Sequence, residues 1–313
     1  MRRDIQLLRG VAVLLVVIYH AGLGITQHGY LGVDVFFVVS GFLITSIILK
    51  NLKTDTFSFS GFYLRRAKRL LPALYSTLAF TSLLAYAFLT GEQWHDYIEQ
   101  IIGAVSFSAN MVLPTQSGYF AGSAETQPLL HIWSLSLEEQ YYFFLPLFLF
   151  LIPRKWQLSG LLLLFIGSFA WCINWTLEPS KAPPLLWRFG EATIGDWAFY
   201  LFPTRAWELL AGSICAWFML KNSNFNIPSA LKWLALITIL IASSSSIDPI
   251  HPRGGALLIV IATSIILLGQ DNWLPNWSPI KWIERVGDWS YSVCLVHWPL
   301  FTFAYLGYLA MVP

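Results

Sequence analysis

The sequence predicts an all-α fold: a polytopic bundle of about nine to ten transmembrane helices with a cytoplasmic N-terminus. Composition is the first observation behind this prediction. Of the 313 residues, 56% are hydrophobic and 12% are charged, whereas soluble globular domains carry about 25% charged residues. The other two observations are apolar runs that recur along the whole chain and basic residues that concentrate on alternate connections.

The apolar runs set the number of spans, because a helix needs about 20 residues to cross a bilayer. Such runs cover residues 7–25, 30–49, 71–90, 132–152, 157–177, 202–220, 230–247, 254–270 and 287–310, with an ambiguous tenth at 98–113. The first run is longer, and richer in large aliphatic residues at its end, than a cleaved signal peptide. We therefore expect it to be a permanent span of one integral membrane domain that covers residues 1–313.

The distribution of charge predicts the orientation, because Lys and Arg in short loops remain cytoplasmic. With the N-terminus inside, an arrangement of about nine spans places most of the 19 basic residues in cytoplasmic connections, while acidic residues collect outside. Cys172, Cys215 and Cys294 fall within the runs, at no spacing suited to a disulfide framework or a metal. We therefore expect no metal site.

The first run, LLRGVAVLLVVIYHAG, contains Arg9 and His20. An ionisable group within a span is costly and normally faces the protein interior. These two residues are about three helical turns apart, share one face, and differ in depth by roughly 16 Å, which predicts His20 near the membrane midplane. A histidine that hydrogen-bonds a neighbouring helix, and an arginine that reaches the membrane interface, remain the alternatives.

The second run, GYLGVDVFFVVSGFLITSIILK, carries Asp34 near its outer end and Ser40, Gly41 and Phe42 in its middle. A Ser-Gly pair allows a close approach to the helix backbone. Either an elongated ligand or another helix explains such a pair, and the sequence does not distinguish them.

A basic segment, FSGFYLRRAKRLLPALY, leads into the third run, with Pro72 expected to open the next helix. Within it Arg65, Arg66, Lys68 and Arg69 crowd the cytoplasmic surface. Arg66 and Arg69 are spaced to share a helix face, and guanidinium groups bind phosphates with two parallel hydrogen bonds. The segment therefore predicts a binding site for a phosphate-bearing cytoplasmic molecule. Positive-inside topology and attraction to anionic lipid are the alternative.

The later runs add further ionisable groups. Glu138 and Glu139 are expected about 10 to 12 Å below the outer face, one of them paired with an arginine or a helix terminus. Arg205 and Glu208 have the i, i+3 spacing of an ion pair, for which a structural clamp is the favoured interpretation. His297 is expected at midplane depth in the last run.

Three helices are thus predicted to bring His20, one of the two glutamates and His297 to similar depths. We expect a polar chamber at mid-membrane, reached from the cytoplasm past the basic segment. A histidine held beside a carboxylate is suited to take a proton from a hydroxyl group.

Six ordered blocks resemble the acyltransferase family three membrane proteins, the O-acetyltransferases that modify bacterial envelope glycans, over essentially the whole chain. Arg9 and His20 match the family's pattern of Arg, ten residues and His. GVDVFFVVSGFLI matches its second-helix block, and Arg66 with Arg69 match its Arg-x-x-Arg loop. The remaining matches are WSLSLEEQYY, FPTRAWELLAG and SYSVCLVHWPL.

The resemblance implies a multi-pass enzyme of the bacterial inner membrane. It would move an acetyl or other acyl group from cytoplasmic acyl-CoA, usually acetyl-CoA, to a sugar hydroxyl of lipopolysaccharide O-antigen, peptidoglycan or exopolysaccharide, with His20 as general base. The residues implied in catalysis are His20, Arg9, Glu138 and Glu139. Those implied in donor binding are Arg65, Arg66, Arg69, Ser40, Gly41 and Phe42. Further candidates are Asp34, Arg205, Glu208 and His297.

The expected partners are acyl-CoA as donor substrate, a membrane-associated glycan as acceptor and the lipid bilayer. No nucleic acid, permanently bound cofactor or metal is expected. Many similar proteins carry an extra terminal span and an outer-face SGNH-type domain, which this sequence lacks, so a truncated chain is an alternative to a complete one.

A transporter or channel for an acyl donor or another solute, without chemistry, is the alternative function. The enzyme is favoured because a base together with a phosphate site fits group transfer, and because no inverted repeat is evident.

Overall fold

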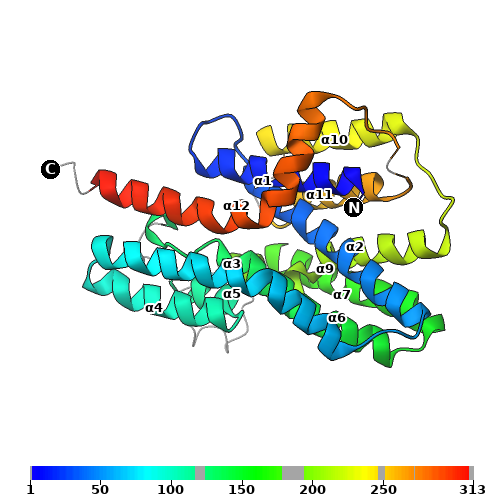
Figure 1. Ribbon diagram of the computed structural model, residues 1–313, viewed down its shortest axis with the longest axis horizontal. Coiled ribbons are helices and arrows are strands. Elements are labelled where there is room, and N and C mark those ends of the chain that lie inside the picture. The colour runs from blue at the N-terminus through cyan, green and yellow to red at the C-terminus, as the bar shows by residue number, and fades with distance from the viewer. Residues whose placement is uncertain (1, 117–123, 178–193, 246–250, 271, 310–313) are drawn as a thin grey trace. The chain divides into compact units, whose positions relative to one another are not determined.

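The computed structural model describes residues 2–116, 124–177, 194–245, 251–270 and 272–309. Their regular secondary structure is entirely helical, with no β-strand among them (Figure 1). The predicted all-α class is therefore confirmed. The helices are α1 (Arg3–His20), α2 (Gly32–Lys53), α3 (Phe59–Phe88), α4 (Gly91–Val105), α5 (Ala109–Val112), α6 (Ile132–Leu151), α7 (Gln157–Leu177), α8 (Ile194–Tyr200), α9 (Phe202–Lys221), α10 (Ser229–Ser244), α11 (Gly254–Leu267) and α12 (Ser278–Leu309). A short 3-10 turn, η1 (Gly29–Leu31), precedes α2.

Three helical segments among the described residues are long and apolar enough to cross a membrane: Gly29–Lys53, Phe59–Phe88 and Arg154–Leu177. Helices α10 and α11 are apolar but shorter. Each of the apolar runs predicted as a span overlaps one helix, and α4 with α5 occupies the ambiguous tenth run. The total number of spans and the cytoplasmic N-terminus stay predictions.

Helix α1 ends at His20, which corrects the expectation of a span that continues past it. The Ala21 N–H donates to Val17 O at 2.9 Å, and the Gly22 N–H donates to Tyr19 O at 3.1 Å. Gly22 has φ +66°, in the left-handed region that commonly ends helices and favours glycine. His20 is therefore the last residue of α1 and not an interior one.

Helix α3 begins before the third apolar run, which corrects a second boundary. The helix starts at Phe59, so the basic segment is helical and Pro72 lies inside the helix instead of opening it. Ser58 caps the N-terminus, because its hydroxyl oxygen accepts a hydrogen bond from the Gly61 N–H at 3.3 Å. Apolar-run length does not detect this polar and basic beginning of α3, although the cap stabilises it.

The chain forms two compact units. The first unit contains Met1–Phe57, Tyr141–Leu177 and Pro203–Ser290. The second unit contains Ser58–Gln140, Glu178–Phe202 and Tyr291–Pro313. Helices α6 and α12 contribute residues to both units.

Helices α1, α2, α10 and α11 form most of the core of the first unit. Its buried aliphatic side chains include Leu8, Ala12, Val35, Ile239 and Ile259. Because α1 packs against this core along most of its length, the helix that carries Arg9 and His20 is held over several turns.

Two glycines bring α2 and α9 into backbone contact within the first unit. A Cβ atom at Gly41 would overlap the carbonyl oxygen of Leu209, and one at Gly212 would overlap the carbonyl oxygen of Val38. Small residues at such a crossing let two helix backbones approach closely. Helix packing, one of the two alternatives for the Ser-Gly pair, therefore accounts for Gly41.

A buried hydroxyl group beside this crossing joins three helices. Ser213 Oγ of α9 accepts hydrogen bonds from Thr45 Oγ1 of α2 at 2.5 Å and from Tyr141 O–H of α6 at 2.5 Å. Its own proton can reach Leu209 O at 3.2 Å or Gly41 O at 3.3 Å. Every hydroxyl in this group thus has a partner, as buried polar groups require.

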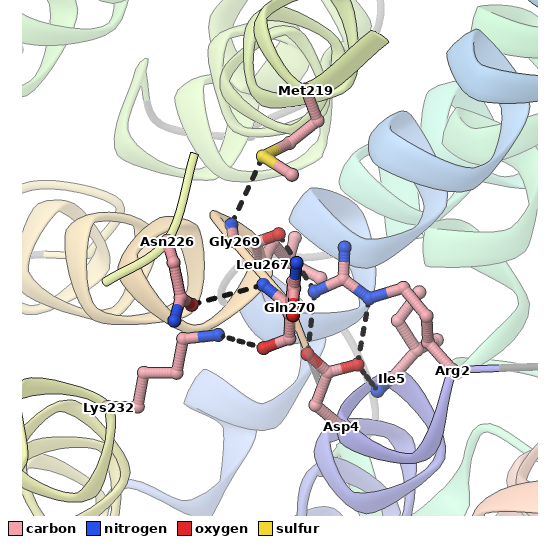
Figure 2. A network of polar contacts seen from close by, with 9 residues as sticks. All are labelled: Arg2, Asp4, Ile5, Met219, Asn226, Lys232, Leu267, Gly269 and Gln270. Atoms are coloured by element: carbon pink, nitrogen blue, oxygen red, sulfur yellow. Dashed lines mark hydrogen bonds and ion pairs between the residues drawn. The ribbon is translucent and has the colours of Figure 1, made fainter. Parts of the chain in front are cut away.

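A polar network fixes the start of α1 in the first unit (Figure 2). The Arg2 guanidinium pairs with Asp4 at 2.6 Å and donates to Leu267 O at 2.9 Å. Lys232, which is fully buried, donates from Nζ to Gln270 O at 2.5 Å. The Arg2 bond ties the N-terminal end of α1 to the last residue of α11, and the Lys232 bond ties α10 to the chain that follows α11.

The second unit is joined by amide and hydroxyl contacts between its helices. Gln100 of α4 donates from Nε2 to Gln116 Oε1 at 2.9 Å, and its Oε1 accepts from the Leu129 N–H at 3.1 Å. The Tyr291 hydroxyl of α12 donates to Leu70 O of α3 at 2.9 Å. This last bond holds α12 beside the basic part of α3.

Candidate active site

The predicted site residues divide between the two units. Those in the first unit are Arg9, His20, Asp34, Ser40, Gly41, Phe42, Arg205 and Glu208. Those in the second unit are Arg65, Arg66, Arg69, Glu138, Glu139 and His297. The convergence of His20, a glutamate and His297 in one chamber stays a prediction.

Helix α1 carries both Arg9 and His20, as the sequence predicts. Arg9 is buried and only 8% exposed, which favours an interior role over an interfacial one. His20 is half-buried, and its ring lies 5.2 Å from that of Tyr19 between centroids. The end of α1 at His20 places the imidazole where the chain leaves the helix.

A fully buried ion cluster in the first unit joins Asp34 of α2 to Arg205 and Glu208 of α9, each 0% exposed. Arg205 Nη2 donates to Asp34 Oδ1 at 2.7 Å, and Arg205 Nε lies 3.3 Å from Glu208 Oε1. The ring of Phe37 lies 5.4 Å from the guanidinium carbon. The predicted Arg205–Glu208 ion pair is thus confirmed, and Asp34 is its third member.

His251 is a fourth member that the sequence prediction missed. Its Nε2 lies 2.7 Å from Arg205 Nη1 and 3.6 Å from Asp34 Oδ1. Because a guanidinium nitrogen only donates, the imidazole Nε2 accepts, and the ring carries its proton on Nδ1. The prediction missed His251 because this residue lies in the connection before α11, where sequence spacing does not relate it to α2 or α9.

The carboxyl groups of this cluster outnumber its guanidinium. Among the described residues, neither oxygen of Glu208 accepts a hydrogen bond, and the same is true of Asp34 Oδ2. Buried charges are stable only when they are paired. Arg205 is therefore the group on which the stability of both carboxyl groups depends.

The donor residues predicted on α2 lie beside α9. Ser40 is half-buried, whereas Gly41 and Phe42 are buried. The Phe42 ring lies 5.4 Å from the guanidinium carbon of Arg2. A donor path along this part of α2 stays a prediction.

The basic segment of α3 pairs with α6 through one arginine. Arg66 Nη2 lies 3.5 Å from Glu139 Oε1, and both side chains are largely buried. Arg65 and Arg69 are exposed, and Glu138 is half-buried. The expectation that one of the two glutamates pairs with an arginine is therefore confirmed for Glu139.

His297 of α12 lies beside a second histidine in the second unit. Its Nδ1 donates to Cys294 O at 2.7 Å and to Val293 O at 3.2 Å, which leaves Nε2 as an acceptor. The His131 ring, at the start of α6, meets it edge to face at 5.9 Å. The sequence prediction missed His131, whose position just before an apolar run carries no distinguishing signal.

Metal chemistry has no candidate ligand set in the described part of the chain. No group of three or more His, Cys, Asp and Glu side chains there is placed to hold a metal ion. The histidines above are positioned instead by backbone carbonyls, an arginine and neighbouring rings.

Three relatives have names that bear on function. The protein of Listeria monocytogenes named peptidoglycan O-acetyltransferase OatA is 29% identical over 94% of this chain and 48% of its own length. YrhL of Bacillus subtilis, provisionally named a peptidoglycan O-acetyltransferase, is 30% identical over 94% of this chain and 47% of its own length. BcsY of Komagataeibacter xylinus, provisionally named a membrane-bound transacylase, is 30% identical over 95% of this chain and 72% of its own length.

This chain spans about half the length of the Listeria and Bacillus relatives. No solved structure matches it. Residues 2–310 match the acyltransferase-domain model of the acyltransferase 3 family. Because this match extends over nearly the whole sequence, the chain belongs to the acyltransferase 3 family.

Proposed function

We propose that this chain is a bacterial inner-membrane O-acyltransferase that moves an acetyl group from cytoplasmic acetyl-CoA to a sugar hydroxyl of an envelope glycan. The family match supports acyl transfer. The name of the Listeria relative supports a cell-wall glycan as the acceptor. The helical segments of membrane-crossing length support a location in the membrane.

The position of His20 is the observation that carries the proposal. Its imidazole is half-buried at the C-terminal end of α1, on the helix that also carries the buried Arg9. The C-terminal end of a helix stabilises positive charge. That is the charge which an imidazole acquires when it takes a proton from a hydroxyl group, so this placement favours a general base.

A single general base accounts for every proton transfer in the proposed reaction. His20 takes the proton of the sugar hydroxyl while the sugar oxygen attacks the thioester carbonyl carbon of acetyl-CoA. The carbon–sulfur bond then breaks, and the imidazolium returns its proton to the coenzyme A thiolate. The products are the acetylated sugar and free coenzyme A, and the imidazole is neutral again.

The arginines of α3 are the proposed contacts for the donor phosphates. Arg65 and Arg69 are exposed, so an anion can approach both. Arg66 contacts Glu139 at 3.5 Å, a longer distance than a charge-assisted hydrogen bond of about 2.8 Å. A phosphate group can therefore compete for the Arg66 guanidinium. The pantetheine arm is proposed to pass Ser40.

The role of His20 is tested with the full chain in membrane vesicles supplied with radiolabelled acetyl-CoA. In His20→Ala we expect acetylation of the envelope glycan to fall by about 10²-fold or more, because general-base catalysis contributes that much, while acetyl-CoA binding is retained. His95→Ala, which changes an exposed histidine on α4, is the control. Glycan acetylation at the unsubstituted level in His20→Ala would remove this residue from the mechanism.

The phosphate contacts are tested by calorimetric titration of acetyl-CoA into the purified chain. Each charge-assisted hydrogen bond contributes about 1.5–3 kcal/mol, so Arg66→Ala with Arg69→Ala is expected to raise the Kd at least tenfold. Arg154→Ala with Lys155→Ala removes two exposed basic side chains from the first unit and should leave the Kd unchanged. An equal Kd in both double variants would mean that the α3 arginines serve topology alone.

A further inference from the structure

An exposed stretch with two glycines follows the end of α1. Gly22 and Gly24, which follow His20, have φ values of +66° and +68°, and residues 22–25 are exposed. Glycine gives the backbone conformational freedom, and helix ends fray. Side chains that pack beside the His20 ring can therefore contribute to holding its orientation.

Tyr30 packs beside the end of α1. Its ring meets that of Tyr19 edge to face, with centroids 5.5 Å apart, and Tyr19 lies against His20. The Tyr30 hydroxyl lies 3.0 Å from His28 Nδ1. Gly29 places this turn directly on α1, because a Cβ atom there would overlap Leu15 O. The turn η1 is thus seated against the last two turns of α1.

The same Tyr30 ring also contacts His251. The two rings meet edge to face with centroids 5.0 Å apart. His251 accepts the 2.7 Å hydrogen bond from Arg205, whose guanidinium is held by Asp34. A continuous series of contacts therefore runs from the buried ion cluster through His251, Tyr30 and Tyr19 to His20, all within the first unit.

We propose that His251 and Tyr30 are positioning residues, which transmit the fixed geometry of the Asp34–Arg205–Glu208 cluster to the base His20. The inference rests on the proposed function of His20. Catalysis needs reacting groups held within about 0.5 Å of their productive geometry, and a displacement of about 1 Å can slow a reaction about 10²-fold. Arg205 gives this cluster a fixed centre, because moving the guanidinium away from Asp34 would leave buried charge unpaired.

The Tyr30 contact is tested by steady-state kinetics of acetyl transfer in membrane vesicles that contain the full chain. Tyr30→Leu removes the ring contacts with Tyr19 and His251. We expect kcat to fall about tenfold, which corresponds to about 1.4 kcal/mol, with the KM for acetyl-CoA within about twofold of its original value. Tyr30→Phe keeps both ring contacts, loses the hydroxyl contact to His28, and should restore most of kcat.

The His251 contact is tested with a second pair of variants. His251→Leu removes the acceptor for Arg205 and should lower kcat as Tyr30→Leu does. His251→Gln supplies an amide oxygen that can replace Nε2 as the acceptor for Arg205, and should recover part of the lost kcat. If Tyr30→Leu does not fold, this pair of variants still tests whether these contacts position His20.

A matched control is Phe225→Leu, which removes an edge-to-face contact with Phe218 elsewhere in the first unit. The inference is overturned if Tyr30→Leu and His251→Leu keep the kcat of this control while His20→Ala abolishes transfer. It is also overturned if kcat and thermal stability fall together and neither conservative variant restores kcat. Transfer that survives in His20→Ala would instead remove His20 from the proposed mechanism, and the inference with it.

Discussion

Arg205→Met and Glu208→Gln should have very different effects on stability, although both residues are fully buried in one ion cluster. Arg205 contacts Asp34 at 2.7 Å, Glu208 at 3.3 Å and His251 at 2.7 Å. Methionine in its place leaves two buried carboxyl groups without the guanidinium. Removing one partner of a buried ion pair costs about 3–5 kcal/mol, and we expect a loss in that range.

Glu208→Gln keeps the shape of the side chain and the Arg205–Asp34 hydrogen bond. Neither oxygen of Glu208 accepts a hydrogen bond from the described residues, and the change leaves Asp34 as the acidic partner of the single guanidinium. The expected loss is therefore below about 1.5 kcal/mol, the scale of one ordinary hydrogen bond.

Thermal denaturation in detergent, followed by tryptophan fluorescence, separates the two variants. At about 2 °C per kcal/mol for a chain of this size, Arg205→Met should lower Tm by about 6–10 °C and Glu208→Gln by less than about 3 °C. Equal decreases in Tm for the two variants would refute the argument that Arg205 supports both carboxyl groups.

Two further predictions concern the contact of α2 with α9. Gly41→Ala should destabilise the chain by about 1–3 kcal/mol through overpacking. The control Gly167→Ala, at a helical site with open space around it, should stabilise the chain by up to about 1 kcal/mol. The same Tm measurement checks both variants, and an unchanged Tm in Gly41→Ala would contradict the close approach of the two backbones. Ser213→Ala should cost about 2 kcal/mol or more, because two buried donors lose their acceptor. Tyr141→Phe removes one of these donors and should cost about 1 kcal/mol, so chemical unfolding should rank Ser213→Ala as the less stable variant.

The sequence predicted the positions of the long helices well because each of them carries a long apolar stretch. It predicted helix ends less well. The end of α1 depends on the left-handed backbone at Gly22, and the start of α3 depends on the Ser58 cap. Both are local effects within one turn, and a criterion based on about 20 apolar residues averages over them.

The candidate site was predictable where its members are close in sequence. The spacing of Arg205 and Glu208 was enough to predict their ion pair. Asp34 and His251 join that pair through tertiary packing between elements far apart in the chain. Nothing in a single sequence specifies such a neighbour, so Asp34 was identified without its partner and His251 was missed.

The glycine crossing restricts how a slender molecule can travel along α2. The backbone of Leu209 fills the space beside Gly41, so no ligand can bind along that side of α2. Ser40 projects about 100° away around the helix axis, so the proposed path of the pantetheine arm past Ser40 lies on a different side of α2. A larger side chain at position 40 would obstruct the proposed path and leave the contact of α2 with α9 intact. A larger side chain at position 41 would instead push these two helices apart.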